Sequence, residues 1–394
     1  MPRVVLVLPT TTYRAADFVD AAAALGAEVI VVSDREQVLS APDRSLAVDF
    51  DDPDGAAAAI EGLEDRVPVD AVFAVDELGV VVAARAAERL GLPHNPPDAV
   101  AATRDKASLR ASLERAEVRQ PAYAVVEPGE VPDLPLPWVV KPRGLSGSTG
   151  VIRVDDAAEV DATFARVRTI AGDAAASLLV ERFVPGAEVA VEGLLRGGAL
   201  DVLAVFDKPD PLDGPYFEET IYVTPSRHPP TQLDEVERLV QQACRAIGLI
   251  DGPVHAEVRL SPEGPVLLEV AARSIGGLCA RTLKFGAGVS LEELLLRHAL
   301  GMPTDGLVRE DTASGVLMLP IPRAGTLVDV GGQDAARSVP GIVGLDITVA
   351  RGRPVQPLPE GDRYLGFLFA RGDTPADVER SLRDAWSKLD IVID

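Results

Sequence analysis

The segment PVHAEVRLSPEGPVLLEVAARSIGG, residues 253–277, predicts the strand pair around which the rest of the chain is organised. Its two extended runs flank Ser-Pro-Glu-Gly at 261–264, where proline suits a type I turn and glycine supplies the left-handed residue of a three-residue hairpin loop. Because side chains alternate along a strand, this turn places Glu257 directly across from Glu269. The same register sets three further pairs, which are Ser261 with Pro265, Arg259 with Leu267 and His255 with Ala271.

Two carboxylates at facing positions of neighbouring strands are costly unless a cation joins them. Their side-chain roots would lie about 5 Å apart, and at an effective dielectric constant near 20 their repulsion is about 3 kcal/mol. Ligation by carboxylate and phosphate oxygens is typical of Mg²⁺. Two solvated glutamates on an exposed sheet face are the alternative. The opposite face is wholly apolar and is expected to be buried, and it comprises Val254, Ala256, Val258, Leu260, Val266, Leu268 and Val270.

The composition limits the classes of protein that fit. The chain has 394 residues and 47% hydrophobic content, enough for two or three domains. Its net charge of −23 argues against a nucleic-acid partner. Val4–Leu8 is too short an apolar run for a signal sequence, and no run reaches membrane-spanning length, so we expect a cytoplasmic protein with no membrane partner. Cys244 and Cys279 are expected to be small buried residues.

The first 97 residues predict a Rossmann-like domain. Short β-branched runs at 3–8, 28–33 and 70–75 alternate with alanine-rich helical patterns, which is typical of a parallel sheet with helices on its faces. The turn after the first run lacks a Gly-x-Gly-x-x-Gly fingerprint, so a dinucleotide site is not indicated. Asp76 and Glu77 follow the third run, where parallel sheets present ligand-binding groups, although a solvated loop fits them equally well.

A glycine- and hydroxyl-rich loop follows the predicted strand 138–141. Lys141 precedes PRGLSGSTG at 142–150, and a second strand is expected at 151–154. Such a loop can lay backbone N–H groups and hydroxyls over phosphates. It differs from a Walker A loop, in which the lysine follows the glycines and a helix comes next. We therefore expect a flap folded over a nucleotide, with an ordinary hairpin loop as the alternative.

Residues 178–192 predict a strand, a Pro-Gly corner and a second strand. The extended backbone at 181–184 offers a donor and an acceptor to an adenine, and Glu188 is placed to accept from ribose hydroxyls. Acids on the surface of a β-ribbon are the alternative. The long loop 207–219 carries proline, glycine, aromatic and charged residues, which favour an ordered lid or pocket wall. An amphipathic helix is expected at 233–247.

Four separated motifs together resemble the ATP-grasp enzymes, and within them the carboxylate–amine ligases that include L-amino-acid (dipeptide) ligases. The motifs are Arg104-Asp105-Lys106, VVKPRGLSGSTGV at 139–151, VERFVPGAEVAVEG at 180–193, and HAEVRL with LLEVAARSIGG at 255–260 and 267–277. The resemblance covers roughly residues 4–300. It implies an α/β and α+β multidomain fold, with a Rossmann-like domain over 1–97, an ATP-grasp domain over 98–305 (nucleotide-clamping part 98–192, catalytic part 193–305) and an α+β C-terminal lid subdomain over 306–394.

The resemblance assigns roles in nucleotide and metal binding. Lys106 and Lys141 are expected to contact ATP phosphates, Glu181 to precede the adenine hinge, and Glu188 to bind the ribose. The two magnesium ligands map to Glu257 and Glu269, where the hairpin register independently indicates a cation. The expected ATP-binding set comprises Lys106, Lys141, Ser146, Gly147, Ser148, Thr149, Glu181, Arg182, Phe183, Val184, Glu188 and Leu268.

For the substrates, the resemblance implies that Arg273 steadies an acyl phosphate and the tetrahedral intermediate. His255 faces the metal side and is expected to position substrate or shuttle a proton, unless it only hydrogen-bonds beside the metal. The expected catalytic residues are Arg273, Lys141 and His255. The expected substrate contacts are Glu77, Lys208, Glu218, Arg273, Gly276 and Gly277. One departure is Ala271, which replaces the asparagine often found in the family and leaves the number of metal ions open.

The implied activity is an ATP-dependent ligation of a carboxylate to an amine. The carboxylate attacks the γ-phosphate of ATP, and an amine then displaces phosphate from the acyl phosphate to form an amide. The implied cofactors are ATP and one or two Mg²⁺ ions, which Mn²⁺ could replace, and the partners are small-molecule substrates, with a homodimer left open. A carboxylating or phosphotransferring ATP-grasp enzyme, and a nucleotide-binding module without turnover, are the alternatives.

Overall fold

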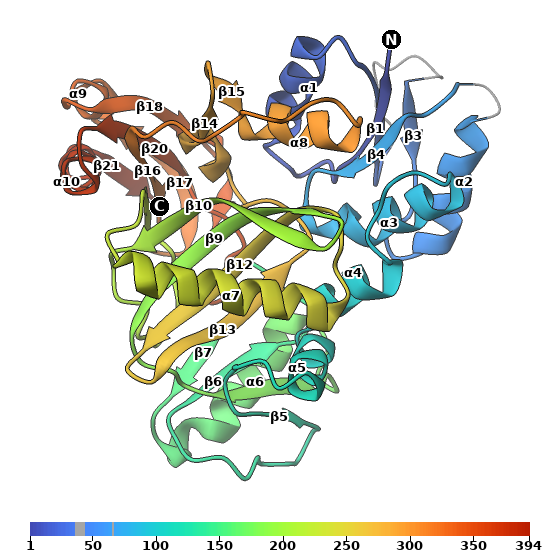
Figure 1. Ribbon diagram of the computed structural model, residues 1–394. Coiled ribbons are helices and arrows are strands. Elements are labelled where there is room, and N and C mark those ends of the chain that lie inside the picture. The colour runs from blue at the N-terminus through green and yellow to red at the C-terminus, as the bar shows by residue number, and fades with distance from the viewer. Residues whose placement is uncertain (36–43, 65–66) are drawn as a thin grey trace.

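The computed structural model of the protein describes residues 1–35, 44–64 and 67–394. Its three lobes correspond to the beginning of the chain, the segment around β5 to β8, and a broad region that ends at the C-terminus (Figure 1). The predicted mixed α/β and α+β fold is confirmed. The division at residues 97 and 305 stays a prediction.

The N-terminal lobe is built on a four-stranded parallel sheet in the order β3-β2-β1-β4. Apolar residues of β1 alternate between two cores, one shared with α1 and α8 and the other with α2 and α3. This confirms the predicted Rossmann-like alternation. The elements are β1 (Arg3–Val7), α1 (Ala15–Ala24), β2 (Glu28–Ser33), β3 (Ser45–Ala47), α2 (Pro53–Glu64), β4 (Ala71–Ala74), a 3₁₀ turn (Glu77–Gly79) and α3 (Val80–Arg89).

The second lobe carries an antiparallel sheet in the order β5-β8-β6-β7, covered on one face by α6. The segment 97–115 forms two helices that separate at Asp105, whose backbone is extended and whose carboxylate accepts from the N–H of Ala107 at 2.9 Å. This cap begins a new helix at Lys106. The elements are α4 (Pro97–Arg104), α5 (Lys106–Arg115), β5 (Tyr123–Val126), β6 (Trp138–Pro142), β7 (Ile152–Val154), a 3₁₀ turn (Ala157–Glu159), α6 (Val160–Ala171) and β8 (Leu178–Arg182).

An eight-stranded antiparallel sheet, in the order β13-β12-β9-β10-β11-β16-β20-β18, forms the largest lobe. Helix α7 lies across the β9, β12 and β13 end (Figure 1), and α10 covers β16 and β20. The first part comprises β9 (Ala187–Arg196), β10 (Ala199–Lys208), β11 (Ile221–Thr224), α7 (Pro230–Ile247), β12 (Gly252–Ser261), β13 (Gly264–Ala271), a 3₁₀ turn (Cys279–Thr282), β14 (Lys284–Phe285), β15 (Val289–Ser290) and α8 (Leu291–Ala299).

The C-terminal strands continue this sheet instead of forming one of their own, because β16 pairs with β11 and β20 pairs with β16. A small sheet in the order β19-β17-β21 flanks it. The elements are β16 (Ala313–Leu319), β17 (Gly325–Gly331), α9 (Gln333–Arg337), β18 (Ile342–Ile347), β19 (Pro354–Val355), β20 (Gly366–Gly372), α10 (Pro375–Trp386) and β21 (Asp390–Ile393).

The central hairpin has a shorter turn than predicted. Ser261 pairs with Gly264, so the loop has two residues, not three, and the predicted pair of Ser261 with Pro265 is wrong. The shorter loop shifts the register by one residue near the turn. Arg259 therefore faces Val266, and the predicted pair of Arg259 with Leu267 is also wrong.

A β-bulge cancels this shift farther along the hairpin. Leu268 is the extra residue on β13, and beyond it Glu257 pairs with Glu269 and His255 pairs with Ala271, as predicted. The carbonyl of Leu268 accepts from Arg110 at 2.5 Å, which satisfies a backbone group that the bulge leaves out of the ladder. As a result Leu267, fully buried, takes the place expected for Leu268 in the apolar core.

Both cysteines, Cys244 and Cys279, are buried free thiols, as predicted. Among the described residues, no helix combines the length and the apolar character that a membrane crossing requires.

Candidate active site

Glu181 is the centre of a buried ion-pair cluster at the junction of the second and third lobes. It lies near the end of β8, where its carboxylate contacts Arg110 at 2.6 Å and Lys141 at 2.8 Å. Burial acts to raise the pKa of this carboxyl, but the two cations outweigh burial and lower the pKa to about 2. Glu181 is thus ionised and holds Lys141, the predicted phosphate contact, in a fixed position.

The glycine-rich loop lies against Lys106 at the start of α5. The ammonium group of Lys106 donates to the carbonyl of Leu145, and its backbone N–H donates to Arg143 at 3.0 Å. The fold therefore brings Lys106 against the loop that Lys141 precedes, and the phosphate site stays a prediction. Ser146 and Gly147 are exposed, whereas Ser148 is half-buried.

Thr149, predicted to contact nucleotide, is buried and its hydroxyl donates to Gly361 of the C-terminal region at 3.0 Å. The N–H of Gly150 donates to Pro359 at 2.8 Å, and Arg166 contacts Glu360 at 2.6 Å. The loop that follows β19 thus covers one side of the flap. The lid role of the C-terminal region stays a prediction.

Aromatic and guanidinium groups surround the expected adenine hinge. Arg153 lies 4.1 Å over the ring of Phe183, and the rings of Phe183 and Phe217 are 6.4 Å apart. Phe217 belongs to the loop predicted to be a lid, which pairs with the flap strand at Ile152 through Tyr216. Arg182 is exposed, and Val184 is half-buried.

A second buried cluster surrounds Lys208 at the end of β10. Its ammonium group contacts Glu188 at 2.7 Å, Glu257 at 3.3 Å, and Glu219. Burial acts to lower the pKa of Lys208, but the three carboxylates raise it well above its usual value. Glu188, the predicted ribose ligand, is buried and also contacts Arg259 at 2.8 Å. The ammonium group of Lys208 therefore lies between Glu188, the expected ribose ligand, and Glu257, an expected metal ligand.

The acidic groups of this cluster have the chemistry of a divalent-cation site. One oxygen from each of Glu188, Glu219 and Glu257 lies within 4.8 Å of the others, and Glu269 faces Glu257 across the hairpin. Hard oxygen donors of this kind suit Mg²⁺. The residues present therefore fit the ion that the motifs imply.

His255 lies on β12, the strand that also carries Glu257. Its Nε2 atom is 3.9 Å from Glu257, and its Nδ1 atom is 3.2 Å from the buried carboxylate of Glu192. Burial acts to lower the pKa of His255, but the two carboxylates outweigh it and raise the pKa. His255 thus lies on the metal side of the hairpin, as predicted.

Arg273 extends from the end of β13 toward the N-terminal lobe, where it forms an ion pair with Glu77. Arg104 contacts the same carboxylate at 3.2 Å. Burial acts to raise the pKa of Glu77, but the two guanidinium groups lower it. Two residues that are 196 positions apart and were both predicted to contact substrate are therefore in direct contact.

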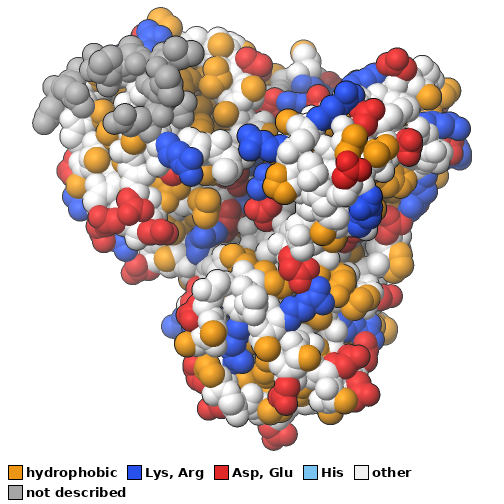
Figure 2. Space-filling model, turned by 180° about the vertical axis from the view of Figure 1, so that it is seen from behind, with side chains coloured by type: hydrophobic (Ala, Val, Ile, Leu, Met, Phe, Trp, Pro, Cys, Tyr) orange, Lys and Arg blue, Asp and Glu red, His pale blue; other side chains and the backbone are white. Residues whose placement is uncertain are grey.

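The turn at Gly276-Gly277 lies beside an aromatic wall. A side chain at Gly277, whose φ is +61°, would come within 2.8 Å of the ring of Phe367. Phe367 packs against Tyr13 and Tyr364. Glu218, the remaining predicted substrate contact, is partly buried, which raises the pKa of its carboxyl. Seen from behind, basic and acidic side chains gather where the three lobes meet (Figure 2).

Several residues of these clusters were not predicted from the sequence. Arg110 carries no motif signal because its helix is rich in charge. Glu219 lies in a loop whose path the sequence does not specify. Glu192 did offer a signal, since it is an acid in the otherwise apolar strand VAVEGLL, residues 189–195.

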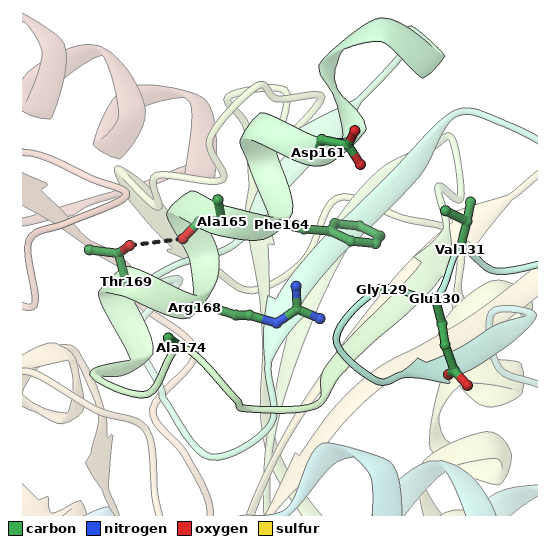
Figure 3. A pocket seen from close by; sticks show the side chains of 9 residues that line it. All are labelled: Gly129, Glu130, Val131, Asp161, Phe164, Ala165, Arg168, Thr169 and Ala174. Carbon is green, nitrogen blue, oxygen red and sulfur yellow. Dashed lines mark hydrogen bonds between the residues drawn. The ribbon is translucent and has the colours of Figure 1, made fainter.

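A separate pocket of about 350 Å³ lies against α6. The side chain of Arg168 extends between Phe164 and the segment 129–131 (Figure 3). None of the residues that line this pocket belongs to the clusters described above.

Comparison with known proteins agrees with this geometry. Residues 134–282 match the ATP-grasp domain, residues 19–94 the ATP-grasp N-terminal domain, and residues 317–394 the L-amino acid ligase C-terminal domain 2. The chain therefore belongs to the ATP-grasp family.

Individual relatives have names that state a particular activity. The chain is 28% identical over 308 residues to alanine–anticapsin ligase of Bacillus subtilis, covering 68% of this chain and 63% of that protein. It is 32% identical over 249 residues to carnosine synthase 1 of Gallus gallus, covering 57% of this chain and 26% of that protein. The crystal structure of L-amino acid ligase from Bacillus licheniformis superposes with a TM-score of 0.85 at 24% identity, covering 100% of this chain and 99% of that one.

Proposed function

We propose that the protein is an ATP-dependent carboxylate–amine ligase that forms an amide through an acyl phosphate and releases ADP and phosphate. The observation that carries the proposal is the placement of Arg273 directly after the strand that pairs Glu257 with Glu269. This places a fixed positive charge beside a carboxylate cluster suited to Mg²⁺. The names of the relatives support an amino acid as one substrate.

Charge stabilisation is the main task of the protein in such a reaction, because phosphoryl transfer concentrates negative charge on the transferred group. Lys106 contacts the glycine-rich loop, Lys141 directly precedes it, and both would contact the ATP phosphates. Mg²⁺, or Mn²⁺ in its place, would be held by Glu257 and Glu269 and would neutralise phosphate oxygens.

Arg273 is the residue that would bind the reacting group of the carboxylate substrate. Its guanidinium group carries N–H donors in a fork that matches carboxylate and phosphate oxygens. Glu77 currently accepts from Arg273 and also contacts Arg104, so two cations face one carboxylate. A substrate carboxylate and then its acyl phosphate would share these donors. The amine attacks the acyl carbon, phosphate leaves, and the amine loses a proton.

The test is a product analysis of the purified chain with MgATP and amino acids, added singly and in pairs. ADP, phosphate and a condensed mass that appear only with a particular pair would establish the ligase and identify its substrates. AMP and pyrophosphate would contradict the proposal, because they indicate adenylation. ADP formed with bicarbonate or with a single acceptor, without an amide, would favour a carboxylating or phosphotransferring enzyme. ATP binding without any turnover across the panel would favour a nucleotide-binding module.

A further inference from the structure

Two buried side chains, Arg14 and Glu192, form hydrogen bonds with the two residues that follow Arg273. The hydroxyl of Ser274 accepts from Arg14 of the N-terminal lobe at 2.8 Å. The N–H of Ile275 donates to Oε2 of Glu192 at 2.9 Å. Ser274 and Ile275 are 2% and 1% exposed, so solvent does not replace these contacts. The course of the chain just after Arg273 therefore depends on Arg14 and Glu192.

The same oxygen of Glu192 also contacts His255 on β12, the strand that carries Glu257. Its Oε2 atom lies 3.2 Å from Nδ1 of His255, whose Nε2 atom lies 3.9 Å from Glu257. The second oxygen of Glu192 is buried and has no hydrogen-bond partner among the described residues. One carboxylate thus contacts both the histidine beside Glu257 and the backbone beside Arg273.

A purely structural role does not account for an acid at this position. Glu192 is fully buried in the middle of β9, between apolar neighbours that pack into two cores. Burying a carboxylate is costly even when it is hydrogen-bonded, and replacing such a group together with its polar partners by apolar side chains is often neutral or stabilising. An aliphatic side chain would pack here without providing an acceptor for Ile275.

We infer that Glu192 is a positioning residue for the ligase reaction: it sets the Arg273 loop relative to Glu257 by accepting from Ile275 and orienting His255. This inference rests on the roles proposed above for Arg273 and Glu257. Because reacting groups must be held in a near-attack geometry, a displacement of about 1 Å can cost about a hundredfold in rate.

The test compares Glu192→Met with Glu192→Gln in the full chain. Glu192→Met removes the acceptor, so kcat should fall about a hundredfold, while the KM for ATP should change less than about threefold because the lysines and the flap are untouched. Its thermal midpoint should fall, because the buried Ile275 N–H and His255 lose their acceptor, so kcat is measured at a temperature where every variant is folded. Glu192→Gln keeps an oxygen for the Ile275 N–H and should recover at least tenfold of the lost kcat.

Asp17→Asn is the control. Asp17 is a partly buried carboxylate on α1 that pairs with Arg281 at 2.8 Å, and neither residue belongs to the clusters described above. This variant should keep the kcat of the unchanged protein. An unchanged kcat in Glu192→Met would overturn the positioning role. A kcat loss that follows the thermal midpoint equally in Glu192→Met, Glu192→Gln and Asp17→Asn would also overturn it.

Failure of the proposed function is recognised separately, in the product analysis of the unchanged protein. If that protein turns ATP over without forming an amide, the ligase assignment falls. The comparison of kcat among the variants still decides whether Glu192 positions the reacting groups.

Discussion

The two buried charge clusters differ in how they balance. Around Glu181, one carboxylate is shared by two cations, Arg110 and Lys141. Around Lys208, three carboxylates are shared by that lysine and Arg259, and Glu269 faces the group from the next strand. The first cluster is satisfied within the protein and can contribute to folding. The second carries an excess of negative charge, which a divalent cation would offset, and this imbalance supports the proposed role in cation binding.

The sharpest way to break this comparison is to remove a carboxylate from the acidic cluster. Glu269→Gln should lower ATP turnover about a thousandfold, because it removes a ligand for the cation that stabilises the transferred phosphoryl group. The thermal midpoint should stay within a few degrees. Glu263→Gln, at the exposed tip of the same hairpin, should leave turnover unchanged. Retained turnover in Glu269→Gln would refute the metal assignment.

The balanced cluster should appear in the acid stability of the protein. The pKa of Glu181 falls from 4.5 to about 2 on folding. Since the folded value is depressed, the stabilisation is complete above about pH 5 and is lost as the pH falls from 4.5 toward 2. It amounts to about 3 kcal/mol. Urea unfolding at a series of pH values should show the free energy of unfolding decreasing by this amount between pH 4.5 and 2.

Arg110→Met provides the comparison for that measurement. It removes one of the two cations and leaves Glu181 buried, so stability at pH 7 should fall by about 3 kcal/mol and the acid slope should become shallower. Arg115→Met, on the exposed side of the same helix, should change stability by less than about 0.5 kcal/mol. If Arg110→Met and the unchanged protein unfold with the same pH slope, Glu181 is not ionised by this pair.

Lys141 belongs to the balanced cluster and is also the proposed phosphate contact. Lys141→Ala should raise the KM for ATP about tenfold or more, because it removes a charge-assisted contact to phosphate, while Arg110 still satisfies Glu181. Lys388→Ala, an exposed lysine in the C-terminal region, is the control and should leave the KM unchanged. Unchanged ATP kinetics in Lys141→Ala would mean that the glycine-rich loop is not a phosphate site.

The smallest effect is expected at the flap. Thr149→Val removes the hydroxyl that donates to Gly361, a bond worth about 1 kcal/mol. Release of a fluorescent ATP analogue should therefore become about fivefold faster in stopped-flow measurements. Thr169→Val removes a hydroxyl bond within α6 and serves as the control. Equal release rates in all three proteins would show that the C-terminal contact does not hold the flap.

The sequence was most informative where a pattern is local. The run 28–33 forms β2 with those bounds, and the facing of Glu257 and Glu269 follows from alternation along two strands. The register near the turn was wrong because a two-residue loop and a bulge at Leu268 compensate each other, and neither leaves a signal in composition. The pairing with Glu269 was thus predicted correctly although the turn was not.

Contacts between distant segments were harder to predict. Glu77 and Arg273 were both expected near substrate, but nothing in either motif indicates that they touch. Arg110 and Glu192 act through buried partners that the sequence does not specify. The continuation of the main sheet into β16 and β20 was likewise missed, because strand order depends on tertiary packing more than on residue pattern.

Ser274, which follows Arg273, contacts Arg14 from 260 residues earlier in the chain, so this part of the site forms only late in synthesis. Domains generally fold in order from the N-terminus as they leave the ribosome. A nascent chain that has exposed only its first 250 residues already contains the glycine-rich loop and Glu181, but it lacks Glu257, Glu269 and Arg273. An unfinished chain can therefore contain the two lysines proposed to contact ATP phosphates while it still lacks the residues proposed to support ATP turnover.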